Sequence, residues 1–168
     1  MSLIAKDTSK TFIPAPEGLH QSVCCDVVDL GEVTDQFGTR ACIRVYWQID
    51  EVNPENERRY LVTKRYTNSL HEKANLRKDL ESWRGKAFAK EELTLGFDLL
   101  KLLGVNGQLN IVHNHKGEDT YANIVSITPL GKGQAKITVS ADYVRVIDRE
   151  NDLGGPPTHD TNGDDTPF

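Results

Sequence analysis

The sequence is short of the features that mark membrane, secreted and disulfide-bonded proteins. No apolar run among its 168 residues is long enough to span a bilayer, and the start of the chain lacks the apolar stretch of a signal peptide. We therefore expect a cytoplasmic protein with no membrane partner. The three cysteines, Cys24, Cys25 and Cys42, are odd in number and lie in apolar, strand-like stretches. Buried free thiols are expected, because an adjacent pair seldom bridges itself.

Signatures of metal, nucleotide and nuclease chemistry are also missing. Only His113 and His115 share a predicted strand face, and no Cys-x-x-Cys or His-Glu-x-x-His motif accompanies them, which argues against a metal site. No Gly-x-x-x-x-Gly-Lys-Ser/Thr loop is present to hold the phosphates of ATP. The acidic residues between positions 26 and 35 have ordinary polar-face spacing rather than the clustering that divalent-metal nucleases need. We therefore expect neither enzyme activity nor a cofactor.

What the sequence does have is a segregated charge pattern. The formal net charge is −5, and the residues from Asp148 onward account for all of it, with six acids against one base. The 19 acidic and 19 basic residues before Asp148 cancel. Within that neutral body, residues 58–90 contain ten bases and three acids, a net charge of +7. Such a patch is typical of a phosphate-backbone binder, although an amphipathic helix also collects lysine and arginine on its wet face.

Apolar periodicity predicts five strands. Residues 20–33 and 37–50 are β-branched and aromatic-rich runs around a short turn, the pattern of a long antiparallel hairpin. A third strand is expected at 58–67. Two more are expected at 107–115 and 120–130, with a turn between them.

A helix is predicted between the third and fourth strands. Ser69 reads as its N-cap, Glu72 completes a capping box, and Gly85 is the stop. The apolar side of this helix comprises Ala74, Leu76, Leu80 and Trp83. A shorter helical stretch is expected at 91–103. Residues 132–146 are read as an extra strand covering the sheet or, alternatively, as an oligomer contact.

Three strands, a helix and two strands is the element order of the OB-fold, a five-stranded Greek-key barrel with a helix between strands three and four. The exposed sheet face and the loops of this fold commonly bind oligonucleotides. We therefore expect a mainly β, OB-fold-like domain over 19–147. A flexible segment over 1–18 precedes it, and a disordered acidic tail over 148–168 follows.

The tail carries an apolar residue, Phe168, shortly after two acidic residues, Asp164 and Asp165. Phe168 offers a ring to a pocket, while its carboxylate and the side chains of Asp164 and Asp165 offer charge to arginine or lysine at the rim. Pro167 limits the conformations lost on binding. The alternative is a solvated chain end, the usual fate of Gly/Pro/Asp-rich termini.

This ending resembles the C-terminal tip of bacterial-type single-stranded DNA-binding proteins, in which an acidic run ending in Pro-Phe docks replication and repair enzymes. The segments YLVTKRYTNSLHEKANLRKDLESWRGKAF and LLGVNGQLNIVHNHKGEDTYANIVSITPL also look like small phage-encoded proteins of single-stranded DNA-binding type. The resemblance implies a protein that coats single-stranded DNA during phage replication, recombination and repair in the host cytoplasm. It also implies recruitment of partner enzymes through Asp164, Asp165, Pro167 and Phe168. A longer helical insertion and the lack of a Gly/Gln-rich linker depart from the bacterial protein and leave the oligomeric state open, with a dimer preferred.

The second strand offers the best DNA-binding surface. Its core side is predicted to be Ile43, Val45, Trp47 and Ile49, and its other side Arg40, Cys42, Arg44, Tyr46 and Gln48. Guanidinium groups and a phenol ring on one face suit single strands, whose bases stack on aromatic rings while cations follow the phosphates. Alternatively, the arginines are solvated and Tyr46 packs under a loop.

Further DNA contacts are predicted outside the second strand. In the third strand the phase is ambiguous, and we predict that Lys64 and Tyr66 rather than Arg65 point outward. Phe37 at the first hairpin tip is an additional stacking candidate, whereas Trp83 is assigned to the core. The predicted DNA-binding residues are Arg40, Arg44, Tyr46, Lys64, Tyr66, Arg84, Lys86 and Tyr121.

A second function fits the same sequence. OB-fold proteins bind proteins as well as nucleic acids, and fold does not fix function. Under this hypothesis the tip competes for host enzymes that recognise the tail of the host's single-stranded DNA-binding protein, which would make the chain a decoy or inhibitor.

Overall fold

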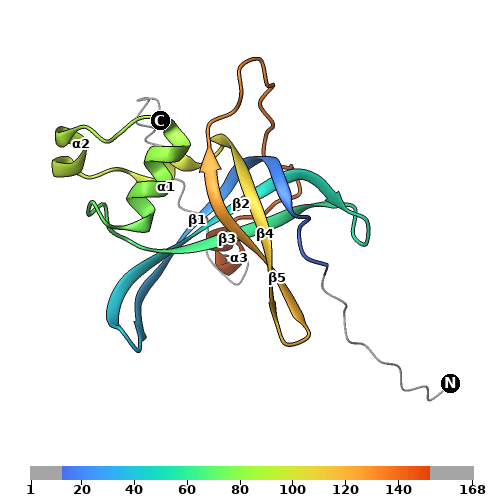
Figure 1. Ribbon diagram of the computed structural model, residues 1–168, viewed down its shortest axis with the longest axis horizontal. Coiled ribbons are helices and arrows are strands. Elements are labelled where there is room, and N and C mark those ends of the chain that lie inside the picture. The colour runs from blue at the N-terminus through green and yellow to red at the C-terminus, as the bar shows by residue number, and fades with distance from the viewer. Residues whose placement is uncertain (1–12, 152–168) are drawn as a thin grey trace.

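Five antiparallel strands form one sheet in the order β3-β2-β1-β4-β5 (Figure 1). The computed structural model describes residues 13–151, with side chains up to Arg149. The strands are β1 (Gly18–Asp35), β2 (Gly38–Asn53), β3 (Arg58–Thr67), β4 (Asn106–Lys116) and β5 (Asp119–Thr128). The helices are α1 (Asn75–Arg84), α2 (Lys90–Leu95), the 3-10 helix η1 (Leu99–Leu102) and α3 (Val146–Asn151). The predicted mainly β fold is confirmed, and within the described residues no helix has the length and apolar character of a membrane span.

The core lies between one face of the sheet and α1. Its β2 side chains are those expected from the alternation, Ile43, Val45, Trp47 and Ile49, and all are buried. Helix α1, which contacts β3 and β5, buries Leu76, Leu80 and Trp83 against them. The rings of Trp47 and Trp83 lie 5.8 Å apart, and Trp83 Nε1 donates a hydrogen bond to the Asn106 carbonyl at 2.9 Å. The predicted core role of Trp83 is confirmed, as is the burial of the three free cysteines.

Helix α1 begins later than the sequence predicts. Its N-cap is Ala74, without a side-chain cap, and Ser69 Oγ instead accepts a hydrogen bond from the backbone N–H of His71 at 3.1 Å. Such local side-chain bonds compete with helical ones, so the predicted capping box was wrong. The predicted end was right, because Gly85 adopts the left-handed conformation, φ 72°, that closes a helix. Gly96, φ 88°, divides the predicted 91–103 helix into α2 and η1.

The segment over residues 131–145, here called the strap, crosses the sheet face opposite α1. It is held by Asn106 of β4, Gln21 of β1, Gln48 of β2 and Arg59 of β3. These residues pair with strap backbone groups from Ala135 to Ser140. Because the strap runs across four strands, it has no neighbour with which to form a strand ladder, and the predicted extra strand is absent from the described chain.

The ends of the described chain differ from the expected domain limits. Ala15, which we assigned to a flexible N-terminal segment, is buried in the core. Helix α3 includes Asp148 and Arg149, where we expected the tail to begin. The remaining tail, 152–168, lies outside the described residues.

Candidate nucleic-acid interface

The sheet face opposite α1 presents two neighbouring rows of side chains. On β3 the exposure alternates, so that Leu61, Thr63 and Arg65 are exposed while the residues between them face the core. On β2, Arg44 and Tyr46 are half-buried and belong to the same outward face as these β3 residues. This pairing places cationic and aromatic groups together on the sheet face opposite α1.

Arg44 and Arg65 are directly opposite each other in the β2–β3 register. Side chains in such a pair have Cβ atoms about 4.5–5.5 Å apart, and like charges in this position destabilise a sheet. Neither guanidinium has an ion pair or a hydrogen bond within the described part of the chain. The fold therefore holds two positive charges side by side, and neither is in an ion pair within the described residues.

A hollow of about 380 Å³ lies next to this pair, at the end of β3 and the loop that follows it. Its cationic lining residues are Arg40, Arg65 and Lys73, and His71 lines it too. None of the described lining residues is acidic. We call Arg40, Arg44, Arg65, His71 and Lys73 the basic groove. Its arrangement suits an extended polyanion, because several cations lie along one path.

One acidic residue lies at the edge of the basic groove. Arg40 forms an ion pair with Asp35 at 2.6 Å, and Asp35 also accepts a hydrogen bond from the Phe37 N–H at 2.8 Å. The Phe37 N–H and the Arg40 guanidinium hold the pKa of Asp35 below its ordinary value. Asp35 thus partly compensates Arg40, and the charge of Arg65 also acts on this carboxylate, although the two form no ion pair.

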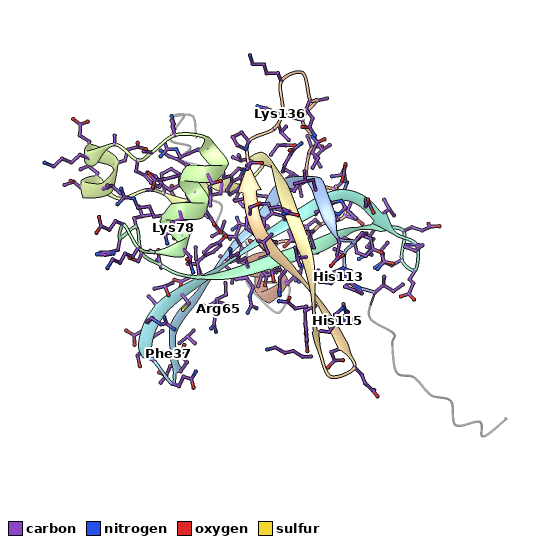
Figure 2. All side chains as sticks on the ribbon, viewed as in Figure 1. Phe37, Arg65, Lys78, His113, His115 and Lys136 are labelled. Carbon is purple, nitrogen blue, oxygen red and sulfur yellow. The ribbon has the colours of Figure 1, made fainter. Side chains whose placement is uncertain are left out.

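Exposed aromatic rings lie on the two long hairpins. Phe37, at the tip of the β1–β2 hairpin, is 78% exposed, and Tyr121, on β5, is 47% exposed. Figure 2 shows Phe37 on one hairpin and His115 on the other, with Arg65 between them in this view. Exposed aromatic rings are the groups on which unpaired bases stack.

The predicted outward face of β3 was wrong for Tyr66. Its side chain is only 4% exposed and donates a hydrogen bond to Asp79 of α1 at 2.6 Å. Burial and the neighbouring Asp79 carboxylate raise the pKa of Tyr66 above its ordinary value. Lys64 also faces α1 and forms an ion pair with Asp79 at 2.8 Å. Strand β3 has no bulge near these residues, so its phase brings Arg65 rather than Lys64 and Tyr66 to the outward face.

Arg84 and Lys86 belong to the positively charged segment 58–90, but they do not line the hollow beside the Arg44–Arg65 pair. The Arg84 side chain is 3% exposed, forms an ion pair with Glu92 at 3.0 Å and stacks on Phe88 with 4.5 Å between its Cζ and the ring centroid. This ion pair joins α1 to α2, and the guanidinium is buried rather than exposed as the predicted DNA contact requires. Lys86 is exposed in the loop after α1.

Of the eight predicted DNA-binding residues, the structure places Arg40, Arg44 and Tyr46 on or beside the outward face. Reasoning from the sequence missed Lys73 and His71, because both were assigned to the helix, and it selected the wrong phase for Arg65. The predicted docking residues Asp164, Asp165, Pro167 and Phe168 lie outside the described chain.

The sequence matches no protein-family model and no curated protein. Inferences about function therefore depend on the interface itself.

Proposed function

We propose that this chain is an OB-type single-stranded DNA-binding protein whose outward sheet face holds the DNA backbone. The strand order supports an OB-type barrel, since β3 and β5, at the two edges of the sheet, contact each other and α1 lies between β3 and β4 in the chain. Such barrels bind oligonucleotides on the outward face of strands two and three and on the flanking loops.

The observation that carries the proposal is the Arg44–Arg65 pair. A cross-strand pair of like charges costs folding free energy, so a bound polyanion that compensates both would recover that cost. The hollow next to the pair adds Arg40 and Lys73, which extends the row of cations. Together these residues favour a ligand with several phosphates in a row over a single small anion.

Aromatic groups support a single strand over a duplex. Phe37 and Tyr121 are exposed on separate hairpins, and unpaired bases have the free ring faces that such side chains bind. Stacking of this kind contributes about 1–3 kcal/mol per base and tolerates any sequence. We infer binding without strong sequence preference.

The tail completes the proposed role. Its acidic residues together with Phe168 would recruit replication, recombination and repair enzymes of a bacterial host to coated DNA. We propose that the sheet face and the tip act separately, one on DNA and the other on proteins.

The test is a fluorescence-anisotropy titration of labelled oligo(dT) and of a matched duplex at low and moderate salt. We expect tight binding to oligo(dT) that weakens steeply with salt, because cations released from the phosphates drive association. Little affinity for duplex is expected. If the protein binds no single strand at low salt, the proposal fails and the protein-binding decoy becomes the better hypothesis.

A further inference from the structure

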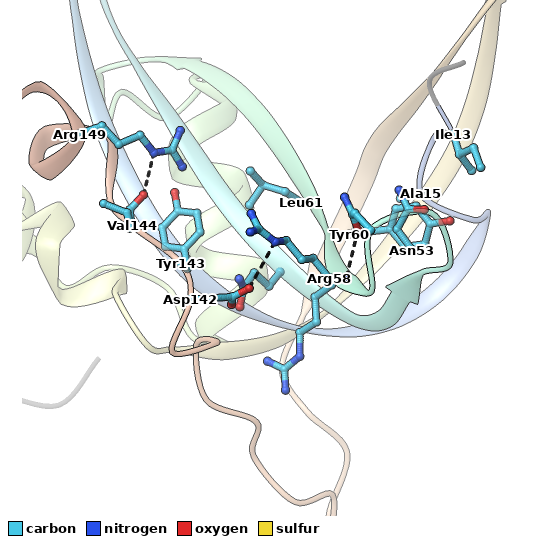
Figure 3. A pocket seen from close by; sticks show the side chains of 13 residues that line it. Ile13, Ala15, Asn53, Arg58, Tyr60, Leu61, Asp142, Tyr143, Val144 and Arg149 are labelled. Carbon is cyan, nitrogen blue, oxygen red and sulfur yellow. Dashed lines mark hydrogen bonds and ion pairs between the residues drawn. The ribbon is translucent and has the colours of Figure 1, made fainter. Parts of the chain in front are cut away.

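A second hollow, of about 600 Å³, lies between the beginning of β3 and the last part of the strap (Figure 3). Its lining includes Arg58, Arg59 and Leu61 on one side and residues 142–144 with Arg149 on the other. This volume is within the range of about 300–1,000 Å³ that small-molecule sites occupy. The barrel alone would not form it, because the strap supplies one wall.

The hollow is cationic. Among the described residues that line it, three are arginines, Arg58, Arg59 and Arg149, and one is an acid, Asp142, which pairs with Arg58 at 3.5 Å. Arg59 donates to the Thr138 carbonyl at 2.6 Å. Arg149 donates to the Val144 carbonyl at 2.9 Å (Figure 3). Carbonyl acceptors hold these two guanidinium groups in place but do not neutralise them. The hollow therefore retains positive charge on positioned side chains, which suits a phosphate group.

The rest of the lining suits a nucleobase. Leu61 is exposed and apolar, and Tyr143 presents a ring that is fixed by a hydrogen bond from its hydroxyl to Asp26 at 3.0 Å. Gln48 and Asn53 add side-chain amides whose oxygens already accept bonds from Ser140 N and Glu55 N. Their NH2 groups remain as donors, and the carbonyl oxygens of bases are acceptors.

The two hollows lie along one strand. Arg59 and Leu61 line the second hollow, Arg65 lines the first, and all three belong to the outward side of β3. Arg59 and Arg65 are six residues apart, a distance of about 20 Å along a strand. Even a fully stacked nucleic-acid strand, at about 3.4 Å per nucleotide, covers that distance with about six nucleotides.

We propose that the second hollow is a nucleotide site at the far end of the same path. Arg59 and Arg149 bind a phosphate there, and the base lies against Leu61 beside Tyr143. The ligand is a nucleotide of the single strand whose neighbours occupy the basic groove, so the inference rests on the proposed function. The strap then has the additional role of lengthening the DNA footprint beyond the barrel.

The experiment measures affinity for oligo(dT) from about 4 to about 16 nucleotides, the range of site sizes per OB fold. The double variant Arg59→Gln/Arg149→Gln should match the wild type on the shortest strands and lose affinity progressively on longer ones. Its slope of log affinity against log salt should fall by about 1 per arginine on the long strands only. The groove variant Arg44→Gln/Arg65→Gln should lose affinity at every length. Lys132→Gln/Lys136→Gln removes two charges at exposed strap positions; it is the charge-matched control and should behave as the wild type (Lys136 is labelled in Figure 2).

Because Arg59 also holds the strap, Arg149→Gln alone is tested as well. Arg149 contacts Val144 by its hydrogen bond and the Tyr143 ring at 5.5 Å from its Cζ to the centroid, and neither contact is with the sheet. The hydrogen bonds that attach the strap to the sheet are therefore kept, and the variant should give part of the length-dependent loss. In the wild type, the NMR signal of the Arg149 side-chain N–H should shift with long strands and not with the shortest. Equal affinities of wild type and double variant at every length would overturn the inference while leaving the proposed function intact. Absence of oligo(dT) binding by the wild type would overturn both.

Discussion

Tyr143 donates a hydrogen bond to the carboxylate of Asp26 at 3.0 Å, from a position 117 residues further along the chain. Asp26 is only 1% exposed, and the same carboxylate accepts bonds from Arg145 Nε at 3.1 Å and from the backbone N–H of Val146 at 2.8 Å. All three donors come from the end of the strap and the start of α3. A buried carboxylate is stable only when it is paired and hydrogen-bonded, so Asp26 and this segment depend on each other.

Replacing Asp26 should therefore release the strap. We expect Asp26→Ala to lower the free energy of unfolding by about 3 kcal/mol, because three donors lose their acceptor. Urea denaturation monitored by tryptophan fluorescence measures this loss in the free energy of unfolding. Glu32→Ala, an exposed position on the same strand, should change stability by less than about 0.5 kcal/mol. Equal effects of the two substitutions would show that Asp26 does not anchor the strap.

Gly107 is required by the packing of Trp83. A Cβ atom at this position would lie 2.6 Å from Trp83 Nε1 and 3.1 Å from the Thr128 carbonyl oxygen. We expect Gly107→Ala to destabilise the protein by about 1–3 kcal/mol, as overpacking a core does. The matched control is Gly131→Ala, where the nearest atom is 3.7 Å away. Thermal denaturation of both variants tests this, and a wild-type melting temperature for Gly107→Ala would contradict it.

The β1 thiols should make stability fall at alkaline pH. Burial raises the pKa of Cys25 from its ordinary 9.0 to about 12, and it raises the pKa of Cys24 as well. Between pH 9.0 and about pH 12 the Cys25 thiol is ionised in the unfolded chain but not in the folded protein. Unfolding therefore releases a proton, and the free energy of unfolding falls as the pH rises. For each thiol, the free energy of unfolding falls by up to about 1.4 kcal/mol per pH unit. Denaturant titrations from about pH 8 to about pH 11 should show a shallower fall for Cys25→Ala, and identical slopes would refute the assignment.

Removing the Arg44–Arg65 repulsion should affect binding and stability in opposite directions. We expect Arg44→Gln and Arg65→Gln each to weaken oligo(dT) binding and to reduce its salt slope by about 1. Each should also raise the free energy of unfolding by about 0.2–1 kcal/mol, since like charges no longer face each other. Lys78→Gln, at an exposed position of α1, should change neither quantity. A loss of binding that is accompanied by a loss of stability would indicate damage to the fold instead.

The acidic tail should compete with DNA for the basic groove. We expect a chain without residues 160–168 to bind oligo(dT) more tightly than the full chain at low salt, with the difference shrinking as salt screens the charges. Phe168→Ala should leave DNA binding unchanged and abolish capture of partner enzymes. Equal affinities of full-length and truncated chains at low salt would rule out the competition.

Several features could be predicted from short stretches of sequence because their causes are local. The alternation of Ile43, Val45, Trp47 and Ile49 correctly identified the core side of β2, and Gly85 correctly marked the end of α1. The burial of the cysteines also followed from their apolar neighbours. Period-two patterns and glycine conformations depend on a few adjacent residues, which is why they can be read without a structure.

The candidate site could be predicted only in part. Arg40, Arg44 and Tyr46 were found because the pattern of β2 is clear, but the phase of β3 differs by a single residue between two alternatives with opposite outward faces. Lys64 and Arg84 were predicted to contact DNA, but in the fold they form ion pairs with Asp79 and Glu92.

The sequence by itself determined the five strands, the helix between β3 and β4, the core side of β2 and the concentration of acidic charge beyond Asp148. Tertiary structure alone decided which cations remain unpaired, because ion pairs such as Lys64–Asp79 join residues whose proximity only folding creates. It also decided the course of the strap, whose anchor at Asp26 lies more than a hundred residues earlier in the chain. Local patterns specify elements, whereas the charge left on a surface depends on partners that the sequence separates and the fold brings together.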